Sequence, residues 1–140
     1  MQPVNQAVDF CLVCEDIRPE PGNKVNILGY YGLLPRVRII LEIWDRPMEK
    51  LTFLVSTHGL TRPYSAQLKL VNPNGTTLIE SIMVTGEPVS DNVSTSAIAF
   101  AFPMLRFQQQ GEHRVQVFID NQPTYDEAFL VQSSQPAVKL

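Results

Sequence analysis

Apolar side chains recur at every second position along most of this chain, and almost nowhere at the spacing of a helix. In the stretch 36–44 every odd position from Val37 to Ile43 is apolar, while the even positions include Arg38 and Glu42. Successive side chains of a β-strand point to opposite faces, so this alternation is typical of strands with one buried face. The pattern predicts an all-β protein.

Nine segments carry this pattern, with turn residues between them. They are Ala7–Cys14, Lys24–Tyr31, Arg36–Trp44, Leu51–Ser56, Ser65–Val71, Thr76–Val84, Val93–Phe102, Glu112–Asp120 and Tyr125–Val131. Many short strands separated by turn signals favour two antiparallel sheets packed face to face. We expect an antiparallel two-sheet β-sandwich, Ig-like or C2-like in layout, with about 8–9 strands. It would form one domain over residues 1–132, followed by a tail over 133–140.

Two of these segments, Ala7–Cys14 and Val93–Phe102, are apolar on both faces. Strands of this kind belong in the interior of a sheet that is covered on both sides. In the second of them Ala97, Ala99 and Ala101 form a face of small residues opposite a face of large ones. We therefore expect close packing on both of its sides.

The polar stretch Glu15–Asn23, rich in Pro and Gly, predicts a long turn between the first two strands. Arg18, Glu20 and Lys24 would fix this turn through exposed ion pairs. Further along, Asn72-Pro73-Asn74-Gly75 is the clearest turn sequence in the chain, with Gly75 suited to a left-handed conformation.

The chain has 140 residues and a formal net charge of −3, with acidic and basic residues interspersed. It has neither the basic stripe of a nucleic-acid-binding protein nor a basic amphipathic helix for a membrane surface. It has no apolar run of membrane-spanning length, and its first residues do not resemble a signal peptide. We therefore expect a cytoplasmic protein that has neither a nucleic-acid nor a membrane partner.

Cys11 and Cys14 are the only cysteines, and their spacing could form half of a zinc site or a redox pair. A tetrahedral zinc site needs two further ligands, and the only histidines, His58 and His113, are isolated. On a strand, an odd separation also places the two thiols on opposite faces. We favour buried, reduced thiols, and expect neither a metal nor a cofactor.

No sequence motif of a known catalytic class is present, which favours a non-catalytic protein and predicts no catalytic residues. The alternative is a small-ligand binder or an enzyme with a site at one loop end, near His58, Asp91 and Asp120. His58 would act as a general base only with a nucleophile or carboxylate in reach. Loop acids, including Asp45 and Asp126, could also converge on calcium, but the spacing of a calcium-binding loop is missing.

Aromatic residues supply the candidate interaction surface. By parity Trp44 lies on the polar face of its strand, where an exposed tryptophan would suit a protein interface. In the competing interpretation it folds over the rim of the sandwich as a plug. Tyr30 and Tyr31, together with Arg18 and Lys24, complete the set of possible interaction residues.

The first hairpin also carries a recognisable arrangement: Cys14-Glu15, Arg18, Glu20, Gly22, Lys24, Ile27, Gly29 and Tyr31. With Leu34-Pro35 and the stretch 111–120, it resembles a family of small uncharacterised bacterial proteins known only as a domain of unknown function. The resemblance implies a bacterial or phage-related β-sandwich and brings no known active site.

Together these features predict a non-catalytic binding or assembly module that acts through a sheet face or one end of the sandwich. A protein is the expected partner. Self-association through an open sheet edge stays an alternative, although Pro35, Pro47 and Pro103 would guard such edges.

Overall fold

The computed structural model describes residues 7–22, 24–91 and 94–134, which form ten β-strands and no helix. The all-β prediction is confirmed. The strands are β1 (Val8–Glu20), β2 (Lys24–Leu33), β3 (Arg38–Leu41), β4 (Met48–His58), β5 (Tyr64–Val71), β6 (Thr77–Glu80), β7 (Val84–Gly86), β8 (Thr95–Leu105), β9 (Gly111–Ile119) and β10 (Gln122–Ser133).

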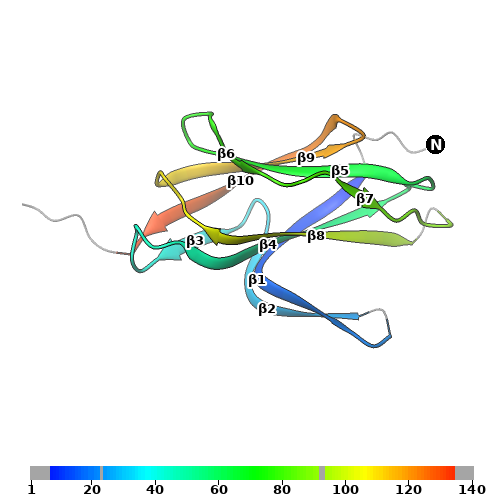
Figure 1. Cartoon of the computed structure of the whole chain (residues 1–140), viewed down its shortest axis with the longest axis horizontal. Helices are drawn as coiled ribbons and strands as arrows, with labels where there is room; N and C mark the ends of the chain where they lie inside the picture. The colour runs from blue at the N-terminus through cyan, green and yellow to red at the C-terminus, as the bar shows by residue number, and fades with distance from the viewer. Residues whose placement is uncertain (1–6, 23, 92–93, 135–140) are drawn as a thin grey trace, which may run out of the picture.

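These strands form two stacked sheets (Figure 1). Sheet A has the order β2-β1-β4-β8, and sheet B has the order β3-β10-β9-β5-β6, with β7 also paired to β5. Within the described residues the strand pairs are antiparallel except for β10 and β3, which run parallel. The predicted antiparallel two-sheet sandwich is thus confirmed, with one parallel pair at an edge. None of the described segments is a helix that could cross a lipid bilayer.

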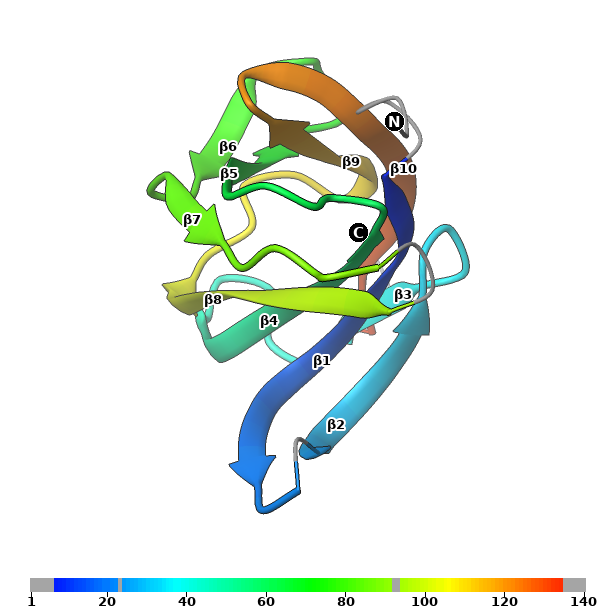
Figure 2. The same ribbon diagram turned by 90° about the vertical axis from the view of Figure 1, so that its right-hand side faces the viewer.

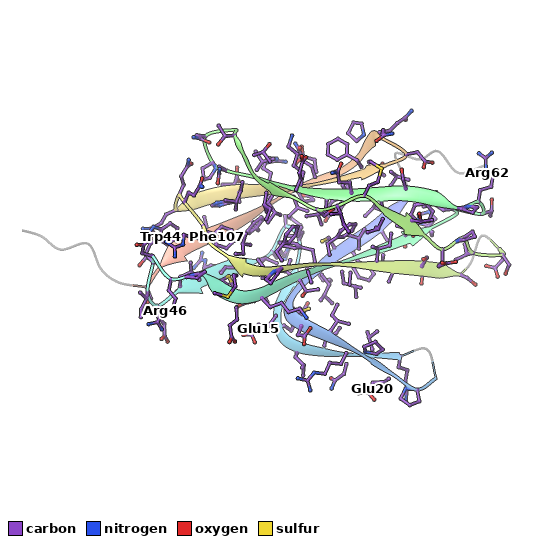
Figure 3. The ribbon with its side chains drawn as sticks, in the orientation of Figure 1. Glu15, Glu20, Trp44, Arg46, Arg62 and Phe107 are labelled. Carbon is purple, nitrogen blue, oxygen red and sulfur yellow. The ribbon has the colours of Figure 1, made fainter. Side chains whose placement is uncertain are left out.

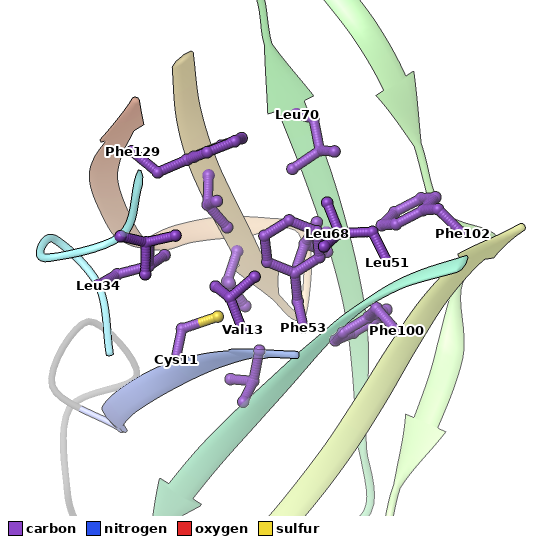
Figure 4. Packing of buried hydrophobic residues seen from close by; sticks show 14 of the residues in the cluster. Cys11, Val13, Leu34, Leu51, Phe53, Leu68, Leu70, Phe100, Phe102 and Phe129 are labelled. Atoms are coloured by element: carbon purple, nitrogen blue, oxygen red, sulfur yellow. The ribbon is translucent and has the colours of Figure 1, made fainter. Parts of the chain in front are cut away.

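The core lies between the two sheets and is centred on Phe53 of β4 (Figure 4). Its ring meets Phe102 of β8 and Phe129 of β10 edge to face, with 6.0 Å between centroids in each case. Leu68 and Leu70 reach the same cluster from β5. Burying a side chain of this size contributes roughly 1.5–3 kcal/mol, so the alternating apolar positions are what hold the sheets together.

The first hairpin differs from the prediction. β1 continues to Glu20, and residues expected to form a long turn are paired, with Glu20 opposite Lys24 and Pro19 opposite Val25. The predicted long turn is wrong. A proline is tolerated in this position because beyond Cys14 β1 has a partner on one side only.

β3 is shorter than predicted and ends at Leu41. It pairs with β10 over four residues only, so the alternation that continues to Trp44 has no neighbouring strand to pair with. Trp44 lies in the turn that follows, half-buried against the core cluster. Its placement on the polar face of a strand was wrong, and its position matches the competing interpretation of a plug at the rim.

The predicted strand 76–84 is divided into β6 and β7, both paired with β5. The division occurs at Ser81, whose backbone N–H donates to the carbonyl of Leu68 at 2.8 Å while its Oγ accepts from the Leu68 N–H at 2.9 Å. The side chain thus replaces a backbone acceptor, and the chain bulges outward. Ile82 is left 80% exposed.

β8 lies at the edge of sheet A, next to β4 alone. Its large residues Phe100 and Phe102 are buried in the core, whereas Ala97, Ala99 and Ala101 are exposed. The expectation of close packing on both sides is wrong. Small apolar side chains tolerate an exposed face as well as a covered one, and only the position of the strand decides between them.

β1 does lie inside its sheet, between β2 and β4, as its two apolar faces predicted. Cys11 belongs to the core cluster, while Cys14, buried outside that cluster, donates its Sγ–H to the carbonyl of Asp16 at 3.5 Å. Both cysteines are free. Burial raises the pKa of each thiol, so the reduced, protonated form is favoured.

The turn at Asn72–Gly75 forms as predicted. The N–H of Gly75 donates to the carbonyl of Asn72 at 2.9 Å, and Gly75 has a φ of +88°. The predicted domain limits remain a prediction. Ser133 ends β10, and residues 135–140 of the expected tail lie outside the described residues.

Candidate functional site

β1 and β2 extend beyond the sandwich as a two-stranded arm. β1 pairs with β4 only from Val8 to Cys14, but it remains paired with β2 as far as Glu20. Figures 1 and 2 show the hairpin leaving sheet A and projecting away from both sheets. We call residues 16–20 and 24–28 the arm.

The base of the arm is bent by one extra residue in β2. Val13 lies opposite Gly32 and Cys14 lies opposite Tyr30, so Tyr31 has no partner in β1. A bulge of this kind bends its strand and increases the local twist. The bend directs the paired strands out of the plane of sheet A.

Gly29 completes the bend. It has a φ of +63°, which glycine adopts without the strain that a side chain would add. A Cβ at this position would also lie 2.5 Å from side-chain atoms of Glu15. The glycine therefore allows the Glu15 side chain to fold over the base of the arm, where Figure 3 shows it, with Glu20 near the tip.

One face of the arm is apolar. Ile17 lies opposite Ile27, and Pro19 lies opposite Val25, which places all four side chains on the same face. Ile27 is 36% exposed and Val25 is 48% exposed. Neither belongs to the core cluster or packs against it, so this apolar face projects into solvent.

The other face of the arm is charged, because alternation places Asp16, Arg18, Glu20 and Lys24 together on it. Arg18 Nε lies 3.9 Å from Asp16 Oδ2. The predicted ion pairs of Arg18 or Lys24 with Glu20 had assumed a turn. In the structure Glu20 and Lys24 instead close a strand ladder.

A groove of about 560 Å³ separates the charged face of the arm from the beginning of β4. The arm and β2 supply one wall, and the loop before β4 with the first residues of β4 supplies the other. Its lining residues are Glu15, Asp16, Arg18, Leu28, Tyr31, Arg46, Pro47, Met48, Glu49 and Lys50.

An ion pair crosses this groove. Lys50 Nζ of β4 lies 2.6 Å from Asp16 Oδ1 of the arm, and the same oxygen accepts the N–H of Ile17 at 2.9 Å. The hydrogen bond from Lys50, followed by the Ile17 N–H, lowers the pKa of the Asp16 carboxyl. The contact links the arm to the sandwich at its base.

Tyr31 connects the groove to the core. It lines the groove and packs, half-buried, against the core cluster. Burial raises the pKa of its hydroxyl, and the charge of Glu15 adds to this effect. Its position follows from the bulge, since Tyr31 is the extra residue of β2.

The structure brings together some of the predicted interaction residues. Arg18 and Tyr31 line the groove, and Lys24 lies near the tip on the charged face. Tyr30 is 58% exposed and lies opposite Cys14. Trp44, two residues before Arg46, is not among the residues that line the groove.

Each residue of the alternative loop-end site forms a hydrogen bond or an ion pair with a partner of its own. Asp91 accepts hydrogen bonds from the backbone N–H and the hydroxyl of Ser94. Asp120 accepts the N–H of Ser65 at 3.0 Å. His58 ends β4, where its Nδ1 lies 2.5 Å from Asp9 Oδ1.

The cluster around His58 contains the three residue types of a hydrolase triad in the wrong order. Asp9 lies in the middle, with Oδ1 toward His58 and Oδ2 3.5 Å from Ser56 Oγ. A serine nucleophile needs the imidazole between it and the carboxylate. This arrangement therefore does not activate Ser56.

The described residues contain no group of three or more His, Cys, Asp or Glu side chains that could hold a metal ion. Two of the acids considered for calcium pair with arginines instead: Asp45 with Arg106 at 3.5 Å and Asp126 with Arg114 at 2.7 Å. Each of these two carboxylates is therefore paired with a different arginine. The loop placement of Asp126 was wrong, because it lies within β10, opposite Gln116.

With this geometry established, comparison with known proteins places the chain in a family. The sequence model of the family of unknown function DUF6941 matches residues 38–132. The chain belongs to DUF6941. The matched segment begins at β3 and runs into β10, so β1 and β2, including the arm, lie outside it. No curated protein sequence matches the chain.

Three solved structures share limited similarity with this DUF6941 chain. The alkylpurine DNA glycosylase AlkC of Pseudomonas fluorescens has a TM-score of 0.42 at 12% identity. The match covers 67% of this chain but only 27% of the AlkC chain. CopC from Methylosinus trichosporium OB3b has a TM-score of 0.38 at 11% identity, covering 72% and 89% of the two chains. An immunoglobulin-like protein of Pseudomonas aeruginosa has a TM-score of 0.34 at 15% identity, covering 85% and 90%.

Sequence reasoning missed the second wall of the groove in this DUF6941 chain. Arg46, Glu49 and Lys50 form that wall, and Asp16 faces them. Asp16 and Lys50 are 34 residues apart in the sequence. Nothing in a single sequence marks such a pair, because the contact depends on the register between β1 and β4, in which Cys14 lies opposite Thr52.

Proposed function

We propose that this protein is a non-catalytic binding module that recognises a partner protein through the arm and the adjoining groove. The observation that carries the proposal is the arm itself, which projects beyond both sheets (Figure 2) and leaves Val25 and Ile27 exposed. Exposed apolar side chains on one face and charged residues on the other are a combination that a protein partner can contact.

The arm is a poor contributor to the stability of the fold. An isolated two-stranded hairpin is marginal in water, and past Cys14 β1 loses its pairing with β4. Burial in the fold therefore does not explain why Val25 and Ile27 are apolar. Burial against a partner does.

The charge of the groove favours a polypeptide as its occupant. Its lining has three acidic residues, Glu15, Asp16 and Glu49, and three basic residues, Arg18, Arg46 and Lys50. A phosphate backbone would be repelled by the acidic half, whereas a protein segment of mixed charge can pair with both. Leu28, Pro47 and Met48 add apolar contact area.

The proposal includes a bacterial source and a cytoplasmic location. The hairpin arrangement between Cys14 and Tyr31 supports the first through its family resemblance. Cys11 and Cys14 support the second, since both are free and buried, as is usual in a reducing compartment.

Photo-cross-linking in the native cells tests the proposal. A photoreactive phenylalanine analogue is placed at position 25 or 27, or at the exposed turn residue Asn74 as the control. We expect the two arm positions to give the same discrete protein adduct, identified by mass spectrometry, and position 74 to give none. With that protein purified, R18A/K24A should weaken binding roughly tenfold with an unchanged melting temperature.

Two results would contradict the proposal. One is an adduct pattern that is equal at positions 27 and 74. The other is a partner that binds R18A/K24A and V25D as tightly as the unchanged protein.

A further inference from the structure

β8 (Thr95–Leu105) is a long strand with a free side. It forms the edge of sheet A and pairs with β4 along ten of its residues. In the described part of the chain no strand pairs with its other side. Alternate residues of an edge strand direct both their N–H and C=O groups away from the sheet.

Two observations identify which residues face outward. Ser96 directs its carbonyl to β4, where it accepts a hydrogen bond from Thr57 Oγ1 at 3.3 Å. Pro103 has no N–H to give, and prolines within sheets are confined to positions whose nitrogen faces away from the ladder. Alternation between them directs the backbone groups of Ala97, Ala99 and Ala101 outward.

Most of this edge lacks the usual protection against pairing with another chain. Natural edge strands carry charged residues or prolines, are very short, or are covered. Pro103 guards only the C-terminal end of β8, and from Thr95 to Phe102 there is neither a proline nor an ionisable side chain. The opposite edge of sheet A, β2, carries Lys24, and β6 at the edge of sheet B carries Glu80.

Apolar surface lies directly beside the free edge. A hollow of about 340 Å³ is lined by β8 residues 99–102 and by the segment 80–84, which joins β6 to β7 and contributes Ile82 and Val84 together with the polar residues Glu80 and Ser81. Ile82 is exposed because the chain bulges at Ser81. A strand added to β8 would cover this side chain.

We propose that β8 pairs antiparallel with β8 of a second copy of this chain, around a two-fold axis at Ala99. The sequence Ala97-Ile98-Ala99-Phe100-Ala101 is complementary to itself in this register. Ala99 lies opposite Ala99 of the second copy, Ala97 lies opposite Ala101, and Ile98 lies opposite Phe100. The three alanine pairs alone would form about six backbone hydrogen bonds.

The self-complementary sequence favours a second copy over an unrelated strand. Small side chains meet on the exposed face, and one aliphatic residue meets one aromatic residue on the core face, a favourable cross-strand pair. No like charges face each other. Sheet A of one copy then continues into sheet A of the other, and the arms remain at the outer ends.

Charge substitutions test the register as well as the dimer. A97K/A101K places like charges opposite each other at both positions, and we expect the dimer dissociation constant to rise roughly tenfold or more. A97K/A101E makes the same two sites charged but places opposite charges across the interface, so its dimer should be at least as tight as that of the unchanged chain. The dissociation constants come from sedimentation velocity, and circular dichroism checks that each variant is folded.

Mixing gives a second readout. A97K/A101K and A97E/A101E should each be weakened alone and should form a mixed dimer when combined. The proposal is overturned if the unchanged chain is monomeric at the highest concentration at which it stays soluble. It is also overturned if A97K/A101K dimerises as tightly as A97K/A101E, because the interface then lies elsewhere.

Discussion

His113 of β9 lies fully buried between the rings of Phe107 and Phe129, with centroid separations of 5.1 and 5.4 Å. Its Nδ1 lies 3.1 Å from the carbonyl of Gly111. It is a hydrogen-bonded histidine near the start of its strand. Burial lowers its pKa, since a charged imidazole is poorly solvated in the core.

This histidine predicts a loss of stability in mild acid. Its folded-state pKa is below the ordinary 6.5, so the unfolded chain binds the proton more readily. The stabilising contribution of the neutral His113 is therefore fully present above pH 6.5. It is lost as the pH drops from there toward the folded-state pKa. Urea unfolding at a series of pH values should show stability rising with pH because of this group, with about 1.4 kcal/mol per pH unit as the upper limit of its slope.

The matched control is H113F, which keeps an aromatic ring between the two phenylalanines. The difference in slope between the two proteins isolates the histidine, because the carboxylates titrate equally in both. Parallel stability curves below pH 6.5 would show that His113 is not the cause.

Asp16 gives a second prediction at the residue scale. The Lys50 hydrogen bond is the largest cause of its lowered pKa, so K50A should move the Asp16 pKa up toward the ordinary value of 3.8. An NMR titration of the side-chain carboxyl measures it directly. E49A, on the same wall of the groove, is the control, and an equal shift in both variants would contradict the pairing.

At the scale of elements, the bend at the base of the arm depends on Gly29. G29A adds the strain of a positive φ and a Cβ 2.5 Å from the Glu15 side chain. We expect a loss of about 1–2 kcal/mol from the backbone conformation alone, and more from the contact. Chemical denaturation of the purified variant measures the total.

G75A separates the two causes. Gly75 also has a positive φ, but a Cβ there would meet nothing within 4 Å. The excess loss in G29A over G75A measures the Glu15 contact, and E15A should remove that excess. Equal losses in G29A and G75A would show that the Glu15 side chain moves away freely.

The limits of some strands were predicted more accurately from the sequence than those of others. β5 and β9 lie in the interior of sheet B, and their alternation gave their limits to within a residue or two. β1, β3 and β8 were misjudged, because the length of a strand depends on how far its neighbour extends. A local pattern contains no information on that neighbour.

At the scale of the whole molecule, stability should reside in the sandwich and not in the arm. F53A removes the central ring of the core and should lower the free energy of unfolding by about 3–5 kcal/mol. V25A, on the exposed face of the arm, should change it by no more than about 0.5 kcal/mol. Denaturation curves of both variants measure the contrast.

If F53A does not fold, F53L serves as the milder variant and should still lose more than V25A. A large loss in V25A would mean that the arm packs against the sandwich in solution. The arm would then be part of the core and a poor candidate for a binding surface.

The sequence by itself determined the all-β class, the two-sheet sandwich and most of the buried residues, because alternation records which face of a strand is buried. It also limited the chemistry, through isolated histidines and dispersed charges. Only the tertiary structure decided which strands lie at the edges, where the first hairpin leaves the sandwich and which charges meet across the groove. Those features depend on contacts between residues far apart in the chain, such as Asp16 and Lys50, and a pattern of neighbouring residues does not encode them.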